Sequence, residues 1–278
     1  MFVINSLEVA MLGAIVGDIV GSRFEFNNHR SKDFELFTKD CFFTDDTIMT
    51  LAVAKCVAAG YEKGNYKIVD ETIVPTMQRL GKKYPNAGWG GMFNLWLGMK
   101  NPYPYDSFGN GAAMRVSSCG FFAKNIPEAA YLSDKVTRVS HNHPEGMKGA
   151  RVVAEIISMI LNGASRTAVR DYAAQNYNIN FTCDSIRSTY QFNETCQETV
   201  PQAIVAFLES KSFEDAIRNA ISVGGDSDTL AAITGSIAEA YYGVPKDIEA
   251  TARTYLDKDL LGILDYVYGV YDTKVSEE

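Results

Sequence analysis

Two short acidic motifs lie near opposite ends of this 278-residue chain, and each directly precedes an apolar, helix-like run. Residues 44–47 read Thr-Asp-Asp-Thr and precede the run 48–59. Residues 224–229 read Gly-Gly-Asp-Ser-Asp-Thr and precede the run 230–242. Both motifs therefore place two carboxylates and flanking hydroxyls at the start of a helix.

Four carboxylates at two helix starts are more than helix capping needs, because one acid already satisfies the free N–H groups of a helix start. Like charges at neighbouring positions repel unless a cation neutralises them. Carboxylate and hydroxyl oxygens suit Mg, Mn or Ca, whereas zinc prefers His and Cys. The pattern favours a shared two-metal site. Capping alone is the alternative at this point.

Two further acids precede the first motif. Asp18 stands on a mostly apolar helix, so a buried carboxylate there needs a partner. Glu25 follows the turn at residues 21–22, and a solvated surface position is the alternative to a functional one. The same helix carries Gly13, Gly17 and Gly21, which cost stability in a helix and therefore indicate close packing against another helix or a ligand.

Small residues at 109–113, Gly-Asn-Gly-Ala-Ala, open a predicted helix, where backbone N–H groups can approach a phosphate. A tight turn is the alternative for this stretch. His141 and His143 form a His-x-His pair, but the further His and Asp ligands of a metallohydrolase are missing nearby. Zinc ligation by this pair is therefore disfavoured.

Helical periodicity dominates the rest of the chain, and alternating strand-like runs are scarce. The sequence predicts helices at 6–20, 44–59, 65–83, 92–99, 127–139, 144–161, 166–174, 200–210, 213–223, 230–242, 245–252 and 260–271, a shaped loop at 101–111, and an irregular region at 176–195. No linker-like stretch divides the chain. We therefore expect an all-α fold, one domain over residues 1–278, with the first and last motifs converging on a common cleft.

Bulk composition narrows the class of protein. Hydrophobic residues make up 46% and charged residues 22%, which is ordinary for a globular protein. The net charge of −8 argues against sequence-independent nucleic-acid binding. Five widely spaced cysteines fit free thiols in a reducing compartment. No signal peptide or membrane span is indicated, so the sequence predicts a cytoplasmic protein.

Taken together, the motifs at 13–18, 44–47, 109–115, 140–141 and 224–229, with Gly21 and Glu25, resemble those of the ADP-ribosylglycohydrolase family, which includes the dinitrogenase reductase activating glycohydrolase. The resemblance spans about residues 8 to 245, and the paired acidic motifs are its most specific part. It implies a single compact, orthogonal, all-helical domain with a dinuclear metal cleft. Two Mg²⁺ ions, or Mn²⁺ in their place, would lie at the base of that cleft.

The resemblance also implies roles for individual residues. The metal ligands would be Thr44, Asp45, Asp46, Asp226, Asp228 and Thr229. Segments that contact the diphosphate and distal ribose would include Gly90, Gly91, Asn110, Gly111, Ala112, Ala113, Met114 and His141. Glu25 matches a glutamate on a flexible segment beside the metals, and Glu25, Asp45 and Asp226 are the catalytic candidates. Trp89 falls near the pocket without an assigned partner.

The implied reaction is hydrolysis of the glycosidic bond between ADP-ribose and an acceptor, through an oxocarbenium-like state. The acceptor would be a protein side chain or a related small conjugate, and no membrane is involved. The charge gives no indication of a nucleic-acid acceptor and leaves it open. Two alternatives are a non-catalytic ADP-ribose-binding protein and a dinuclear-metal hydrolase of a small ADP-ribosyl or phosphoester metabolite. The acceptor, the division between acid and base, and the oligomeric state are undetermined by the sequence.

Overall fold

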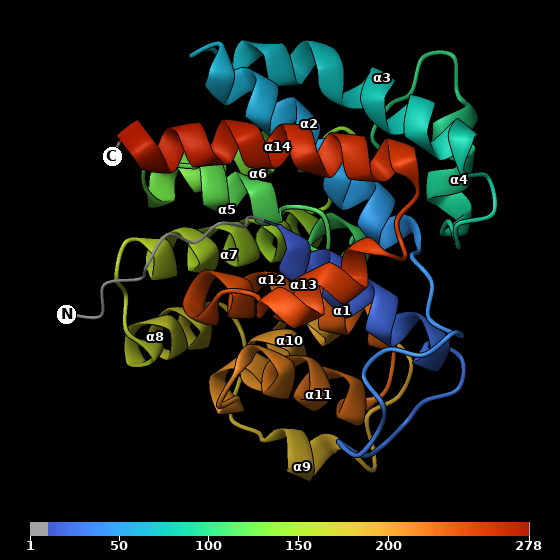
Figure 1. The fold of residues 1–278 in the computed structure, drawn as a ribbon, viewed down its shortest axis with the longest axis vertical. Helices are drawn as coiled ribbons and strands as arrows, with labels where there is room; N and C mark the ends of the chain where they lie inside the picture. Colours follow the sequence, from blue (N-terminus) through green and yellow to red (C-terminus); the bar gives the residue numbers. More distant parts are fainter. Residues whose placement is uncertain (1–10, 278) are drawn as a thin grey trace.

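The computed structural model describes residues 11–277, which form fourteen α-helices and two short 3₁₀-helices, with no strand in this range (Figure 1). The helices are α1 (Leu12–Gly21), α2 (Asp45–Glu62), α3 (Lys67–Lys83), α4 (Gly91–Gly98), α5 (Ser117–Phe122), α6 (Ile126–Thr137), α7 (Pro144–Leu161), α8 (Arg166–Asn176), α9 (Cys183–Ile186), α10 (Cys196–Glu209), α11 (Phe213–Val223), α12 (Ser227–Tyr242), α13 (Lys246–Arg253) and α14 (Lys258–Glu277), with η1 (Ser22–Phe24) and η2 (Asn110–Ala112). The all-α prediction is confirmed.

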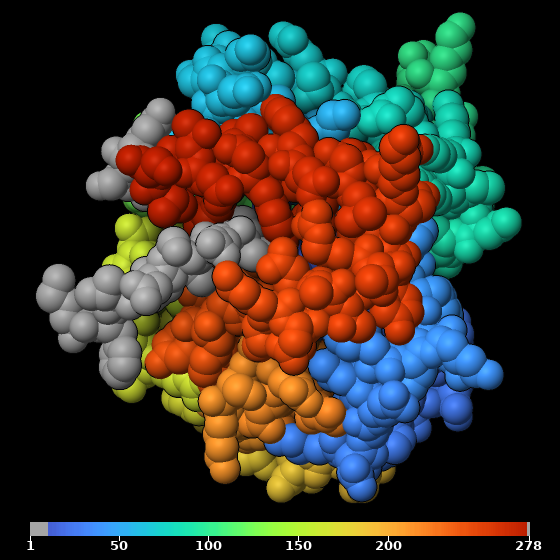
Figure 2. All heavy atoms as spheres, in the orientation of Figure 1, coloured from blue at the N-terminus to red at the C-terminus, as the bar shows by residue number. Residues whose placement is uncertain are grey.

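Helices α1, α7 and α12 cross the middle of the view in Figure 1, with α2–α6 and α14 on one side and α8–α11 on the other. The α12 helix is buried over nearly its whole length, because it packs against α1, α7, α10 and α11. Helices α13 and α14 occupy the centre of one face, between the segment 25–43 and α3 (Figure 2). The centre of the fold is therefore a helix whose start carries the second acidic motif.

Glycines let α1 approach α12 backbone to backbone. The two helices run antiparallel, with Gly13 opposite Gly235 and Gly17 opposite Ala231. A Cβ atom on Gly17 would lie 2.1 Å from the Ala231 carbonyl oxygen, and one on Gly21 would lie 2.5 Å from the Cα of the residue it faces on α12. No side chain fits at such distances. The predicted close packing of these glycines is confirmed, and the neighbour is a helix.

Asp18 joins α1 to the start of α2. Its carboxylate is fully buried and accepts backbone N–H groups from Thr44 at 2.9 Å and Thr47 at 3.0 Å. Both threonine hydroxyls also donate to it, the Thr44 hydroxyl at 2.7 Å. A buried carboxylate is thereby satisfied by donors at a helix start. The expectation that Asp18 needs a partner is confirmed, and its role is to fix where α2 begins.

Glu239 does the same for α1 from within α12. Its buried carboxylate accepts the N–H groups of Leu12 and Gly13, at 3.3 and 2.9 Å. Burial nevertheless raises the pKa of Glu239 from 4.5 to about 8. The folded protein therefore retains a proton that the unfolded chain loses near pH 4.5. The stability from this group is greatest below that value and is lost as the pH rises through about 8.

We expect Glu239→Gln, which cannot ionise, to weaken that pH dependence. Between about pH 5 and about pH 8, the wild-type free energy of unfolding should fall by about 3–4 kcal/mol more than that of the variant. Urea unfolding in the presence of EDTA at several pH values measures this difference. If the free energy of unfolding changed with pH in the same way for both proteins, the pKa of Glu239 would not be raised in the folded state.

Several element boundaries differ from the predictions. Residues 6–10 of the predicted helix 6–20 lie outside the described residues. Within the described residues, α1 runs from Leu12 to Gly21. Helix α2 passes residue 59, where the predicted helix 44–59 ends, and continues to Glu62, because Gly60 packs against Tyr66 and does not terminate the helix. The irregular region 176–195 contains the four-residue α9. The helices predicted at 144–161 and 213–223 are confirmed as α7 and α11.

Candidate metal centre

The starts of α2 and α12 meet at a cleft of about 370 Å³. Its lining includes Asp45 and Asp46 from α2, Asp226 before α12, and Asp228 and Thr229 from the first turn of α12. All but Asp45 are buried. The structure thus brings together acids that are far apart in the sequence, because α1 positions both helix starts from one side.

Close spacing makes this cluster electrostatically costly. Carboxylate oxygens of Glu25, Asp226 and Asp228 lie within 4.8 Å of one another. Burial, and next the neighbouring carboxylates, raise the pKa of Asp45, Asp46 and Asp228 well above the usual range. The acids of one helix start contribute to the shifts at the other, so the two motifs form one electrostatic unit.

Helix capping does not account for these acids. At the start of α2 the capping bond is accepted by the Thr44 hydroxyl, from the Asp46 N–H at 3.2 Å. At the start of α12 the N-cap residue is Asp226, one acid of the four. Asp45, Asp46 and Asp228 are therefore not needed as caps. Thr44 itself points its hydroxyl at Asp18, whereas the other five predicted ligands line the cleft.

Unsatisfied oxygens show that the cluster fits a cation. Within the described chain, Asp46 Oδ2 and Asp228 Oδ1 are buried and accept no hydrogen bond. Leaving buried charged oxygens unpaired is strongly unfavourable, and a divalent cation would satisfy both. Thr229 lies beside the carboxylates of both Asp46 and Asp226, and so joins the two motifs. The donors are all oxygens, which suits Mg²⁺ or Mn²⁺.

Asp18 should be needed for this arrangement although it is not among the residues that line the cleft. Replacing it by Ala leaves four donors at the start of α2 without an acceptor, so we expect a loss of about 3 kcal/mol in the free energy of unfolding. Mg²⁺ affinity should fall as well, because Asp45 and Asp46 lose their support. Urea unfolding and a Mg²⁺ titration measure both, with exposed Asp33→Ala as the control. If Mg²⁺ affinity were unchanged in Asp18→Ala, Asp18 would not be needed to position Asp45 and Asp46.

One wall of the cleft comes from residues 107–115. Asn110 donates its side-chain amide to Asp226 Oδ2 at 2.7 Å, so it also supports the acidic cluster. Neither Gly109 nor Gly111 has a positive φ, so the backbone does not require glycine there. A Cβ on either residue would lie 3.5 Å from His141 Nε2, so small residues keep open the space beside this imidazole.

The remaining predicted wall residues divide into two groups. Gly90, Gly91 and Met114 line the cleft, and the space where a Cβ of either glycine would lie is open. Ala112 and Ala113 are buried in the hydrophobic core and are not part of the lining. The structure therefore brings twelve of the fifteen predicted site residues to the lining of the cleft, Glu25 and Asp45 among them, and leaves Thr44 and the two alanines outside that lining.

Electrostatics differ between the two sides of the cleft. Arg115 is buried, its Nη2 donates to the Ser140 hydroxyl at 2.8 Å, and its Nε has no hydrogen-bond partner within the described chain. It is the sole Lys or Arg in the described lining, and no described carboxylate forms an ion pair with it. Burial, and next the Arg115 charge, lower the pKa of His141 well below its usual value, so His141 is neutral. One wall is cationic and the floor is acidic.

Several residues of the site were not found from the sequence. Glu194 lines the cleft from an irregular segment with no recognisable pattern. Asn28 exchanges two hydrogen bonds with the Gly225 backbone, donating to its carbonyl and accepting from its N–H, both at 2.8 Å. Arg30 donates to the Val223 carbonyl at 2.7 Å. These bonds join the segment after α1 to the loop before α12 and fix the second acidic motif.

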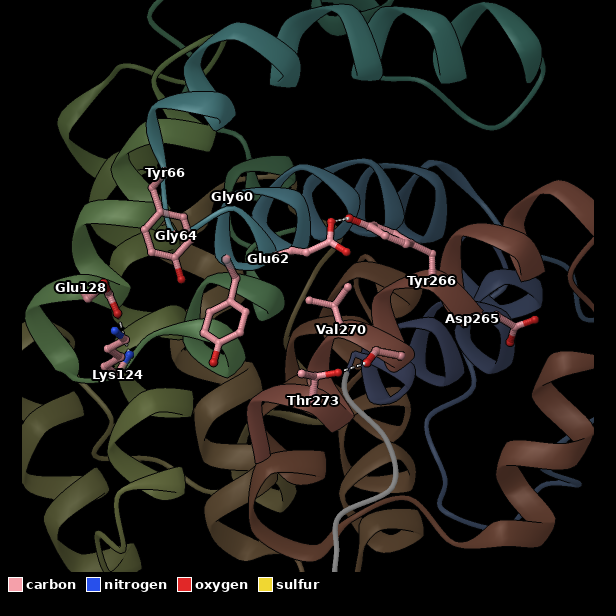
Figure 3. Close-up of a pocket in the computed structure, with 12 residues that line it drawn as sticks. Gly60, Glu62, Gly64, Tyr66, Lys124, Glu128, Asp265, Tyr266, Val270 and Thr273 are labelled. Atoms are coloured by element: carbon pink, nitrogen blue, oxygen red, sulfur yellow. Dashed lines mark hydrogen bonds between the residues drawn. The ribbon is translucent and has the colours of Figure 1, made fainter. Parts of the chain in front are cut away.

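A larger hollow of about 750 Å³ lies between the end of α2, the start of α6 and α14 (Figure 3). Its acids already have partners: Glu62 accepts from the Tyr266 hydroxyl, and Glu128 accepts the Lys124 N–H at 2.7 Å. Asp265 accepts from the Arg253 guanidinium. The hollow therefore lacks the unpaired buried carboxylates that distinguish the smaller cleft.

The described residues form an all-α protein, and its cleft carries a cluster of acids that could hold a metal ion. The sequence model of the ADP-ribosylglycohydrolase family matches residues 5–275, and the chain belongs to this family. The resemblance noted in the sequence is confirmed. The chain is accordingly a glycosidic-bond hydrolase of the ADP-ribosylhydrolase type.

Three named relatives show the breadth of the family. "ADP-ribosylarginine hydrolase Tri1" of Pseudomonas putida (strain GB-1) is 28% identical, over 84% of this chain and 70% of that protein. "ADP-ribosyl-[dinitrogen reductase] glycohydrolase" of Rhodospirillum rubrum is 26% identical, over 84% and 85%. Human "ADP-ribosylhydrolase ARH3" is 24% identical, over 90% of each chain. Two of these names give an acceptor, which is arginine in the first and dinitrogen reductase in the second.

The fold is also that of a solved structure, described as an "ADP-ribosylglycohydrolase-related protein complex". The TM-score is 0.70 at 21% identity, and the match covers 95% of this chain and 96% of the other. Between residues 11 and 277, no helix has the length and apolar character needed to cross a bilayer. The single-domain organisation over 1–278 and the cytoplasmic location stay predictions.

Proposed function

We propose that this protein is a Mg²⁺-dependent hydrolase that releases ADP-ribose from an ADP-ribosylated protein side chain or a related small conjugate. One observation carries the proposal: a single cleft joins an oxygen-only acidic floor with unpaired buried carboxylate oxygens to a wall with a buried, unpaired Arg115. The floor suits divalent cations and the wall suits a diphosphate. The names of the relatives support the same substrate class.

Four aspartates are enough for two cations. Asp45, Asp46, Asp226 and Asp228 carry the charge that two divalent ions would neutralise, and the Thr229 hydroxyl is a further oxygen donor beside them. Mn²⁺ could replace Mg²⁺, since both take oxygen ligands. When bound, the ions would supply electrostatic stabilisation and an activated water at the reacting carbon. Thr44 would act through the α2 cap and its bond to Asp18.

The cationic wall would hold the ADP part of the substrate. Arg115 would face the diphosphate, and the neutral His141 would offer Nε2 beside Gly109 and Gly111. Open space at Gly90 and Gly91 would admit the sugar without a clash. Fixing the ADP part in this way would orient the scissile bond over the acids. Holding the reacting groups in place lowers the entropic part of the activation barrier.

Glu25 is placed to move the proton. It is partly exposed, its carboxylate lies within 4.8 Å of the Asp226 and Asp228 oxygens, and no described residue hydrogen-bonds to that carboxylate. It would take a proton from the attacking water or deliver one to the departing acceptor. Asp45 and Asp226 would position the reacting groups. A Glu25→Gln variant that binds ADP-ribose normally and retains full activity would contradict this role.

The test is a panel of conjugates incubated with the protein, with Mg²⁺ and with EDTA. ADP-ribosylated arginine, ADP-ribosylated serine and ADP-ribosylated DNA are the acceptors, and released ADP-ribose is the product to be measured. We expect release from at least one conjugate with Mg²⁺ and none with EDTA. Binding without release would point to a non-catalytic protein, and phosphate release from simple phosphoesters alone would point to phosphoryl chemistry.

A further inference from the structure

One side-chain amide links the segment that carries Glu25 to the loop that carries Asp226. Asn28 Oδ1 accepts the Gly225 N–H at 2.8 Å. Asn28 Nδ2 donates to the carbonyls of Gly225, Phe24 and Glu25, at 2.8, 2.9 and 3.0 Å. An amide has two N–H groups, so one of them is shared between two carbonyls. Both ends of this side chain are therefore bonded to backbone, and the two segments are joined through it.

The segment that carries Glu25 has few other attachments. Within the described chain, the bond from Asn28 is the one hydrogen bond that the Glu25 carbonyl accepts, and the Glu25 carboxylate accepts none. The next two residues, Phe26 and Asn27, are exposed, and the Phe26 ring stacks on Phe192, which is exposed too. Beyond the end of η1, the position of Glu25 thus depends mainly on Asn28.

Electrostatic repulsion acts against this position. Carboxylate oxygens of Glu25, Asp226 and Asp228 lie within 4.8 Å of one another. Like charges at such distances repel. The two aspartates are buried, whereas Glu25 is only half-buried, so Glu25 is the acid that can move out towards solvent. Bonds that hold its backbone in place oppose that movement.

The loop before α12 has attachments that do not involve Asn28. Arg30 donates to the Val223 carbonyl at 2.7 Å and to the Tyr190 carbonyl at 2.6 Å. A Cβ atom on Gly225 would lie 2.3 Å from the Tyr190 ring, so this ring packs directly on the loop. Loss of the Asn28 side chain should therefore release Glu25 and leave the loop where it is.

We propose that Asn28 is a positioning residue for the reaction, because it holds the Glu25 carboxylate beside Asp226 and Asp228 against their mutual repulsion. Asn28 is not among the residues that line the cleft, so it acts through Glu25 and not on the substrate. The inference rests on the proton-transfer role that the proposed function gives to Glu25. An aspartate at position 28 would not suffice, since a carboxylate cannot donate to the Glu25 carbonyl.

The first test is structural and needs no activity. In a crystal structure of Asn28→Ala, we expect the Glu25 carboxylate to lie farther from Asp226 by more than about 1 Å, a displacement large enough to impair catalysis. Asn28→Asp, which has the same size and can still accept the Gly225 N–H, should show the same displacement. Asn27→Ala is the matched control, because Asn27 is exposed and forms no hydrogen bond within the described chain.

The second test is a double-mutant cycle on the ADP-ribosylated conjugate that the wild-type protein cleaves fastest. Asn28→Ala alone should lower kcat about 10- to 100-fold and change KM less than about 2-fold. In a Glu25→Gln background the same change should lower kcat less than about 2-fold further, because two residues that act as a unit are not additive. Asn27→Ala should leave kcat and KM unchanged in both backgrounds.

Two outcomes would overturn the inference: a Glu25 carboxylate that keeps its place in Asn28→Ala and Asn28→Asp, or losses from Asn28→Ala and Glu25→Gln that multiply. Multiplied losses are what a general structural role of Asn28 would give. Failure of the proposed function looks different, since the wild-type protein would then cleave no conjugate. In that case the crystal structures decide the inference by themselves, through the position of Glu25.

Discussion

The Asp228→Asn variant is expected to be more stable than the wild-type protein without metal and to be almost inactive. Asp228 is buried, its Oδ1 has no partner within the described chain, and neighbouring acids raise its pKa further. Removing one charge from the cluster relieves repulsion, so we expect a gain of about 1–2 kcal/mol in the free energy of unfolding in EDTA. The same change removes a metal ligand, so activity should fall by about 10³-fold or more.

Urea unfolding with EDTA and then with Mg²⁺ separates the two effects. Wild-type protein should be stabilised by Mg²⁺, since a ligand that binds only the folded state shifts the equilibrium towards it. The Asp228→Asn protein should show little or no such gain. Asp171→Asn, an exposed acid on α8, is the control and should behave as wild type. A variant that is destabilised in EDTA yet keeps its response to Mg²⁺ would contradict the metal assignment.

The Gly17→Ala variant is expected to lose about 3 kcal/mol or more in the free energy of unfolding, through overpacking. The added methyl group would lie 2.1 Å from the Ala231 carbonyl oxygen and 2.5 Å from the Ala232 nitrogen, so backbone must move against backbone. Helix α1 cannot retreat freely, because Glu239 and Asp18 fix its two ends. The displacement should also separate the starts of α2 and α12 and weaken Mg²⁺ binding.

A matched glycine replacement isolates this effect. Gly262 lies in α14, is exposed, and a Cβ there would meet nothing within 4 Å. Gly262→Ala should therefore raise stability by up to about 1 kcal/mol through helix propensity alone. If the packing account is correct, urea unfolding gives a lower free energy of unfolding for Gly17→Ala and a higher one for Gly262→Ala than for wild type. In a Mg²⁺ titration, only Gly17→Ala should bind more weakly. A Gly17→Ala protein as stable as Gly262→Ala would show that α1 and α12 adjust without cost.

Local patterns made the acidic floor predictable. Thr, Asp and a following apolar run mark the helix starts, and the surplus of acids at 44–47 and 224–229 favours a bound cation from the sequence alone. The glycines of α1 likewise showed that something packs closely against them, without naming α12. The structure adds the reason why the two helix starts converge. Glu239 links α12 to α1, and Asp18 links α1 to the start of α2.

Other features depend on contacts between distant segments and leave no local pattern. Asn28 bonds to Gly225 across 197 positions, and Arg30 bonds to Val223 across 193. Glu194 lies in a segment without periodicity, so nothing in the sequence placed it at the cleft. Arg115 was part of a recognised motif, but its lack of a carboxylate partner is visible only in the fold. The end of the predicted helix 44–59 was wrong by three residues, because Gly60 packs inside α2, which ends at Glu62.

The most direct test of the account is anomalous scattering from crystals of the protein soaked in Mn²⁺. We predict two Mn²⁺ peaks in the cleft, with ligand distances of about 2.0–2.5 Å to carboxylate oxygens from both helix starts. Asp46 Oδ2 and Asp228 Oδ1, the buried oxygens without partners, should be among those ligands. A cleft without Mn²⁺, or ions bound by the acids of only one helix, would contradict the central claim that α2 and α12 share one metal centre.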